Sequence, residues 1–155
     1  MERKDISSWL SGPRAALAEQ GLDLGYPGQR LGLPAQGQGS VASMGRRMAA
    51  LFVDWFACMA ISALINPSVA FRTKPLLTLV IFVIEVVILS TLTGSSFGQR
   101  IMGIGLIGLD GNRVGVGRIA VRTWLLSWVI PAIVYDRDGR GLHDKVANCV
   151  VVRLR

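Results

Sequence analysis

Residues 48–65 read MAALFVDWFACMAISALI and residues 75–92 read PLLTLVIFVIEVVILSTL, and these two apolar runs decide the fold. A helix that spans a bilayer needs about 20 predominantly apolar residues. Each run contains one acid, Asp54 in the first and Glu85 in the second. An ionised acid in hydrocarbon costs roughly 3 kcal/mol or more, so such residues usually face protein, water or a partner charge. The two acids are therefore the first candidate functional site.

The composition indicates an integral membrane protein. Of the 155 residues, 51% are hydrophobic and 17% are charged, whereas an ordinary soluble domain has about 25% charged residues. The formal net charge is +7. Because the basic residues flank the apolar runs and form no stripe, we attribute this charge to topology and to anionic lipid headgroups, and not to nucleic acid. No cleavable signal is expected, since the first apolar run begins too late in the chain.

Charge and turn signals predict the topology of a multi-pass protein of the plasma membrane. Arg46 and Arg47 mark the cytoplasmic end of a first helix over about residues 44–66, and a second helix over about residues 75–93 returns to the cytoplasm. The N-terminus is then cytoplasmic. Residues 1–43 are rich in Gly, Pro and Gln and predict a flexible cytoplasmic arm, because such a composition buries little apolar surface.

The predicted topology places the two acids at similar depth. At about 1.5 Å per residue, Asp54 lies about 10 Å inward from Arg47, and Glu85 lies about 10 Å inward from the cytoplasmic end of its helix. Arg47 and Asp54 are seven residues apart, on one helical face, but too far apart along the axis for a direct i, i+4 ion pair.

Residues 100–116 predict a small cytoplasmic β-hairpin. They contain glycines in the GxGxxG spacing of dinucleotide-binding folds, but the stretch runs into Asp110-Gly111, a strong two-residue hairpin signal, instead of opening a helix. The run at residues 148–154 is β-branched and supplies a C-terminal strand, which joins the hairpin in a three-stranded sheet.

A third apolar segment, about residues 117–135, is interrupted by Arg122 and contains Pro131. We predict a short re-entrant or interfacial helix with Trp124 and Trp128 near the headgroups. The alternative is a third full span that leaves the basic C-terminal tail outside, which the positive-inside rule disfavours. The predicted fold class is thus an α-helical membrane protein with two transmembrane helices, a short re-entrant or third transmembrane helix, and a small cytoplasmic β-hairpin or three-stranded sheet.

No metal or cofactor is expected. Cys58 and Cys149 are isolated and resemble small buried hydrophobic residues. His143 is the only histidine, and one histidine does not build a zinc site.

Several short motifs occur in a characteristic order. They are GRRMAALFVD at 45–54, SFGQRIMG at 96–103, Asp110-Gly111, Arg122, and LHDKVA at 142–147. Over about residues 44–152 this series resembles the RDD family of small membrane proteins, which is named for one arginine and two aspartates. By position these are Arg47, Asp54 and Asp144. The resemblance implies an integral membrane protein, with transport suspected for some members, and Glu85 lies outside the family signature.

Each candidate residue has two interpretations. Asp54 either binds a cation or proton or anchors an arginine such as Arg47, Arg100 or Arg122, and the anchor is favoured. Glu85 either shares a proton with Asp54 or is hydrogen-bonded, in its neutral form, to another helix or subunit.

We expect Asp144 to bridge to Arg47 or Arg100 and so to lock the C-terminal segment under the helices. The predicted charge network is therefore Arg47, Asp54, Arg100, Arg122 and Asp144, with Glu85 and Asp54 as the possible proton or cation site.

The sequence leaves three function classes to consider, which are an enzyme, an accessory subunit and a transporter. An enzyme is not expected, because no nucleophile with a base, metal cluster or phosphate loop is present in the sequence. The favoured hypothesis is an accessory or assembly subunit of a larger membrane complex, respiratory or otherwise energy-transducing, whose partners are the anionic bilayer and other membrane subunits. The alternative is a proton- or cation-coupled transporter that acts as an oligomer through Asp54 and Glu85, since two helices are few for a transporter acting alone.

Overall fold

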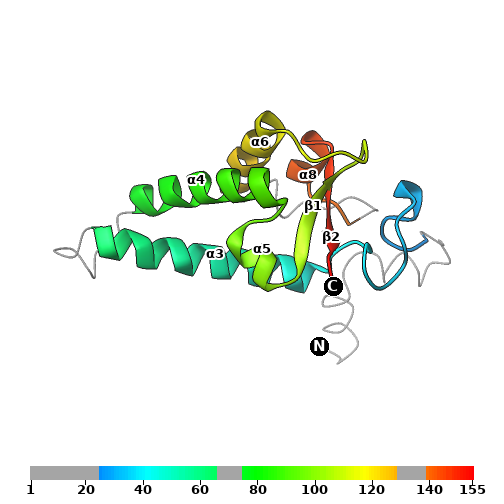
Figure 1. Cartoon of the computed structure of the whole chain (residues 1–155), viewed down its shortest axis with the longest axis horizontal. Coiled ribbons are helices and arrows are strands. Elements are labelled where there is room, and N and C mark those ends of the chain that lie inside the picture. The colour runs from blue at the N-terminus through cyan, green and yellow to red at the C-terminus, as the bar shows by residue number, and fades with distance from the viewer. Residues whose placement is uncertain (1–24, 66–74, 129–138) are drawn as a thin grey trace, which may run out of the picture.

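The computed structural model describes residues 25–65, 75–128 and 139–155. In chain order the elements are η1 (Gln29–Leu31), α3 (Met44–Ile65), α4 (Pro75–Thr93), α5 (Phe97–Ile101), β1 (Ile104–Gly108), α6 (Val116–Ser127), α8 (Leu142–Val146) and β2 (Cys149–Arg153). The two long helices, α3 and α4, extend from a compact group that consists of α5, β1, α6, α8 and β2 and that we call the cap (Figure 1). The bounds of α3 and α4 agree with the two predicted helices to within one residue.

The helices α3 and α4 pack side by side through faces that repeat every four residues (Figure 1). A spacing of four brings side chains to one face of a helix. The buried residues are Ala50, Asp54, Cys58 and Ser62 in α3, and Thr78, Phe82, Val86 and Ser90 in α4. The ring of Trp55 also meets that of Phe82 edge to face, with centroids 5.9 Å apart.

The outer faces of α3 and α4 are exposed and apolar. The large exposed side chains are Phe52, Phe56, Ile61 and Leu64 in α3 and Leu76, Val80, Ile84, Ile88 and Leu92 in α4. Four polar residues are thus among the eight buried ones, whereas the large exposed side chains are apolar, which is unusual for a water-soluble helix pair. Both helices, of 22 and 19 residues, are long and apolar enough to cross a membrane.

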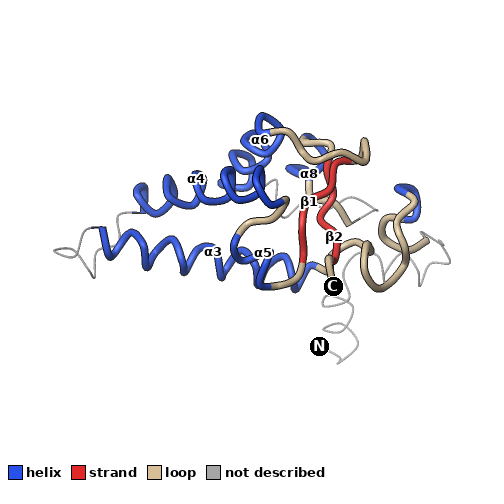
Figure 2. Tube along the Cα trace, in the orientation of Figure 1, coloured by secondary structure: helices blue, strands red, loops and turns tan. Residues whose placement is uncertain are grey.

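The sheet contains β1 and β2 in antiparallel order, with Ile104 opposite Arg153 and Gly108 opposite Cys149. Figure 2 shows both strands together at the cap end of the helix pair. The predicted hairpin over residues 100–116 is therefore wrong, because β1 pairs with the C-terminal strand. The turn at Asp110-Gly111 leads instead into α6, whose N-cap is Gly115.

The pairing of β1 with β2 has a physical reason. The residues Cys149 to Val152 of β2 are all buried, so pairing with this strand removes more apolar surface from water than pairing with the polar sequence Asn112-Arg113. A local turn signal is thus overridden by burial of a distant strand.

The second edge of β2 is covered by residues 39–42. The N–H of Gly39 donates to the Arg153 carbonyl at 2.8 Å, the N–H of Arg153 to Ser40 at 2.9 Å, and the N–H of Ala42 to Val151 at 2.9 Å. The prediction of a flexible arm over residues 1–43 is therefore wrong for this stretch, because the edge of a buried strand needs hydrogen-bond partners. Residues 1–24 lie outside the described part of the chain.

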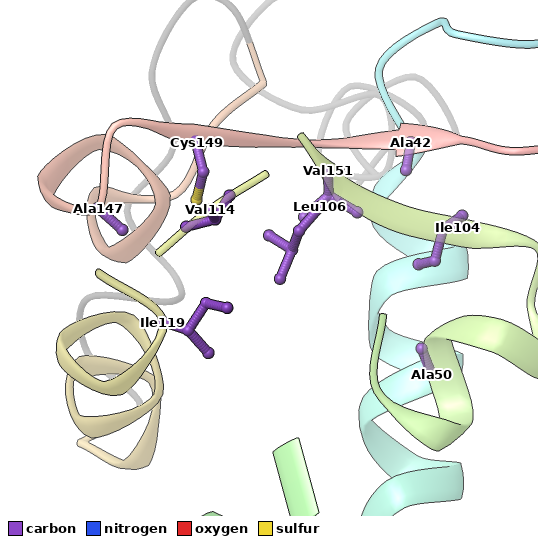
Figure 3. Close-up of a cluster of buried hydrophobic side chains, with 9 residues drawn as sticks. All are labelled: Ala42, Ala50, Ile104, Leu106, Val114, Ile119, Ala147, Cys149 and Val151. Atoms are coloured by element: carbon purple, nitrogen blue, oxygen red, sulfur yellow. The ribbon is translucent and has the colours of Figure 1, made fainter. Parts of the chain in front are cut away.

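The cap has its own apolar core between the sheet, the start of α3 and the helix α6 (Figure 3). Its buried residues are Ala42, Ala50, Ile104, Leu106, Val114, Ile119, Ala147, Cys149 and Val151. The helix α6 begins at Val116, one residue before its predicted start, and the predicted extension to residue 135 lies largely outside the described residues. Trp124 and Trp128 are both exposed, with ring centroids 6.1 Å apart.

Candidate functional site

Asp144 lies at the centre of a buried charge cluster inside the cap. Its side chain is 0% exposed, and the short helix α8 carries it between α3 and α6. One carboxylate oxygen is 3.1 Å from Nη1 of Arg47, and the other is 2.7 Å from Nε of Arg122 and 3.2 Å from Nε2 of His143. The carboxylate thus connects three helices that are distant in sequence.

Arg47 extends this cluster to the sheet. Its Nε donates to the carbonyl of Ala42 at 3.1 Å, and its Nη2 donates to the carbonyl of Val151 at 3.3 Å. One guanidinium at the start of α3 therefore binds α8, β2 and the chain segment that pairs with β2. A planar fork of donors suits such a junction better than a lysine does.

The electrostatics of the cluster favour the charged forms of its members. Burial opposes ionisation of Asp144, but the positive charges of Arg122, His143 and Arg47 outweigh it and lower the pKa of the carboxyl below its ordinary value. Burial likewise opposes the charge on Arg122, but Asp144 keeps the pKa of its guanidinium raised. Burial raises the pKa of the neighbouring Cys149 thiol to about 11, so the thiol is protonated at neutral pH.

The lowered pKa of Asp144 predicts that the cap opens in acid. Its ion pairs contribute full stability above the unfolded-state pKa, 3.8, and lose it as the pH falls through the folded-state value. Cys149, whose Sγ is 3.6 Å from the carbonyl oxygen of Asp144, can report this opening in a Cys58→Ala background. We expect its modification by dithiodipyridine, normalised to the unfolded chain, to be slow down to about pH 4 and faster below.

A different dependence of the Cys149 modification rate on acid pH would contradict this expectation. Modification that accelerates as soon as the pH drops below neutrality would show that loss of the Asp144 charge does not open the cap, because the carboxylate keeps its charge in that range. The exposed pair of Asp110 and Arg118, 2.9 Å apart, supplies the control. Asp110→Asn should leave the modification rate of Cys149 in acid unchanged.

The two acids of the long helices meet at the N-terminus of α5. Asp54 accepts hydrogen bonds from the hydroxyl of Ser96, at 2.6 Å, and from the backbone N–H of Gly98. Glu85 accepts from the backbone N–H of Phe97 at 2.9 Å. The predicted similar depth of Asp54 and Glu85 agrees with this geometry, but their hydrogen bonds go to α5 and Ser96, not to each other.

The local sequence explains why α5 needs these acids. The first N–H groups of any helix have no partner within the helix. In α5, Glu85 binds the N–H of Phe97, Asp54 binds that of Gly98, and the Ser96 hydroxyl accepts from the N–H of Gln99 at 3.3 Å. Negative charge is also favourable at this end of a helix. All three donors of this five-residue helix are therefore satisfied.

Ser96 and Gln99 form a capping box, because the side chain of Gln99 also accepts from the N–H of Ser96 at 3.1 Å. The spacing of a serine and a glutamine three residues later is a recognised sign of a helix start. This signal stands in the motif SFGQRIMG, where sequence reasoning did not use it and assigned the segment in part to a hairpin.

The arginines that were predicted as partners of Asp54 have other positions in the structure. Arg47 and Arg122 bind Asp144, and neither forms a salt bridge with Asp54 among the described contacts. Arg100 is exposed on α5 and lies outside the cluster. Arg47 stands in the first turn of α3, about two helical turns from Asp54, so its side chain reaches the cap more easily than the acid. The prediction that Asp54 anchors an arginine is corrected: it anchors α5.

A pocket of about 180 Å³ lies between the charge cluster around Asp144 and the hydrogen bonds that Asp54 makes with Ser96 and α5. Asp54 and Ser96 line one part of it, and Arg47, Arg122 and His143 line another. The rest of the wall is largely apolar and includes Met44, Met48, Leu51, Phe82, Val86 and Leu126. Residues of the charge cluster and of the hydrogen-bonded group of Asp54 and Ser96 thus line one common pocket.

Comparison with known families agrees with this arrangement. The family model of the RDD family matches residues 41–148, from the segment that pairs with β2 to the end of α8. The chain belongs to the RDD family. No similar protein was found among curated proteins, and none among solved structures.

Membership of the RDD family and the two apolar helices together indicate a membrane protein. In this RDD protein the arginine and the two aspartates identified in the sequence hold the cap to the long helices. Arg47 and Asp144 bind each other directly, and Asp54 binds the turn of α5 that packs against α3.

Proposed function

We propose that this RDD protein is a non-enzymatic accessory or assembly subunit of a larger complex in the plasma membrane. The observation that carries the proposal is that Asp54 and Glu85 are both occupied in holding α5. An acid that binds the backbone of a neighbouring helix is part of the architecture and is poorly placed to bind and release an ion at each turnover.

The outer faces of α3 and α4 support an assembly role. They carry large exposed apolar side chains along their length, so they suit lipid or the helices of another subunit. Two spanning helices are also few for a substrate path. A small protein of this form stabilises a neighbour more readily than it transports a solute alone.

The charge distribution supports a cytoplasmic cap and N-terminus. The basic residues of α3 are Arg46 and Arg47, both in its first turn, and α4 contains none. Cytoplasmic flanks of spanning helices carry such an excess of Lys and Arg. We place the helix α6 along the inner membrane surface, because Trp124 and Trp128 are exposed together on it and Trp is favoured at the headgroup level.

Cysteine accessibility tests the orientation. Arg155→Cys lies at the cap, and Leu76→Cys lies at the opposite end of the helix pair, where Leu76 is 72% exposed. A membrane-impermeant maleimide should label Leu76→Cys in intact cells and Arg155→Cys only in inverted vesicles. Labelling of Arg155→Cys from outside intact cells would overturn the cytoplasmic cap.

The experiment that tests the proposed function is purification from native membrane in mild detergent, followed by mass spectrometry. An accessory subunit should be recovered in a stoichiometric complex with a different membrane protein. Glu85→Gln should keep the fold, because the amide oxygen still accepts from the N–H of Phe97, whereas Glu85→Leu should lower recovery of the complex. Recovery only as a homo-oligomer would overturn the proposal.

A second candidate function is a proton- or cation-coupled transporter that acts as an oligomer. The specific observation in its favour is Oε2 of Glu85, which is buried without a hydrogen-bond partner among the described residues. Intramembrane acids of this kind mark ion paths in many membrane proteins. Proton or sodium flux in liposomes that Glu85→Gln abolishes would favour the transporter, and flux at the level of empty liposomes would favour the accessory subunit.

A further inference from the structure

Arg122 carries a donor that its own cluster does not use. Its Nε binds Asp144, but its Nη1 is buried and has no hydrogen-bond partner among the described residues. The residue as a whole is 3% exposed. Buried guanidinium nitrogens are normally paired, so this nitrogen of a pocket-lining residue indicates an acceptor that the described residues do not supply.

The pocket beside Arg122 has one charged end and one apolar side. Arg47 lines the charged end together with Arg122, and Leu51 and Leu126 contribute to the apolar wall. Asp54 also lines the pocket, but its two oxygens already accept from Ser96 and Gly98. The polar end therefore offers hydrogen-bond donors, and the apolar side suits hydrocarbon.

The pocket opens at the first turns of α3. Met44 and Met48 line it and are also 44% and 37% exposed. In the proposed orientation these turns lie at the cytoplasmic surface of the bilayer, beside Arg46 and Arg47. A ligand that enters there comes from the headgroup layer, where anionic groups and acyl chains are found together.

We propose that this pocket binds the headgroup of an anionic phospholipid, with a phosphate oxygen accepting from Nη1 of Arg122 and the acyl chains leaving past Met44 and Met48 into the bilayer. The free volume of about 180 Å³ accommodates a phosphate and its glycerol link, since a cavity of about 150 Å³ holds a benzene ring. The pocket itself does not depend on how the protein lies in the membrane, but the entry of the ligand from the headgroup layer rests on the orientation proposed above.

Native mass spectrometry of the delipidated full-length protein tests the site. The protein is offered phosphatidylglycerol and phosphatidylcholine in equal amounts. We expect one phosphatidylglycerol to be retained at least about tenfold more strongly than phosphatidylcholine, because phosphatidylcholine cancels the charge of its own phosphate. Equal retention of the two lipids would overturn the proposal.

Two variants locate the site. Met48→Trp fills the opening without touching the charge cluster and should lower retention about tenfold, whereas Phe52→Trp, exposed on α3 outside the pocket, should not. Arg122→Lys keeps a positive charge for Asp144 but has no second donor nitrogen for the phosphate, so it should lower retention, whereas its control Arg118→Lys on α6 should not. Equal retention in Met48→Trp and Phe52→Trp would place the lipid elsewhere and overturn the proposal.

A final arm separates a lipid headgroup from a free anion. Millimolar inorganic phosphate should compete only weakly with phosphatidylglycerol, because it gains nothing from the apolar wall. The midpoint of thermal unfolding is also measured with each ligand. If inorganic phosphate alone raises this midpoint as much as the lipid does, the site binds a free anion and the proposal fails. These readouts use the isolated protein, so a failure here leaves the hetero-complex expected of an accessory subunit separately testable.

Discussion

Asp144→Asn should unfold the cap. The substitution removes the acid that pairs with both Arg47 and Arg122 among the described residues, and both guanidinium groups lie at most about one-tenth exposed. Breaking a buried pair by removing one partner costs about 3–5 kcal/mol. This is a large part of the 5–15 kcal/mol that typically stabilises a folded domain. Thermal unfolding and the reactivity of Cys149 in detergent should both show the loss.

Two controls make the Asp144 prediction specific. Asp110→Asn breaks the exposed pair with Arg118 and should leave the unfolding curve unchanged. The double variant Asp144→Leu with Arg122→Met replaces opposite charges by apolar groups and should recover part of the stability, as such replacements often do. An Asp144→Asn protein as stable as the wild type would show that the charge cluster does not hold the cap.

Gly98→Ala should detach α5 from α3. A Cβ at residue 98 would overlap the backbone carbonyl oxygen of Ala50 and lie 2.9 Å from Oδ1 of Asp54. The overlapped atom is backbone, so α5 must move, and both hydrogen bonds of Asp54 are then lost. Overpacking costs about 1–3 kcal/mol, and leaving a buried acceptor without its hydrogen bond costs about 1–3 kcal/mol. The free energy of unfolding, measured in a denaturant series, should fall by at least the first amount.

The matched control for Gly98→Ala is Gly117→Ala in α6. A Cβ at residue 117 meets no atom within 4 Å, and Ala is favoured over Gly in a helix by about 0.5–1 kcal/mol. This control should therefore be neutral or stabilising. If the two alanine variants behave alike, the close approach of α5 to α3 is not a feature of the folded protein.

The long helices could be predicted from the sequence because their signal is strong and local. Runs of eighteen predominantly apolar residues identify α3 and α4, and Arg46 and Arg47 mark the basic end of α3. The rise of a helix then places Asp54 and Glu85 at one depth. The meeting of both acids at α5 was not predicted, since a helix of five residues has little periodicity and its start signal, the spacing of Ser96 and Gln99, was not used.

The remaining errors concern contacts between distant parts of the chain. Asp110-Gly111 correctly indicates a turn, but a turn signal does not say which strand pairs with β1, and the buried valines of β2 decide that. The flexible-arm prediction failed at residues 39–42 for the same reason, because composition does not reveal the open edge of β2. Charge alone offered Arg47 or Arg100 as the partner of Asp144, and only packing selects Arg47. The second partner, Arg122, was not predicted for this acid.

A double-mutant cycle between Asp54→Ala and Ser96→Ala tests most directly the central claim that Asp54 holds α5 in place. The cycle subtracts the capping of Gln99 by Ser96 and isolates the hydrogen bond between the two side chains, which is 2.6 Å long. A coupling energy above about 0.5 and up to about 3 kcal/mol in the free energy of unfolding is expected, because the two side chains are in direct contact and both are buried. Additive effects, within about 0.5 kcal/mol, would contradict the claim and return Asp54 to the candidates for ion binding.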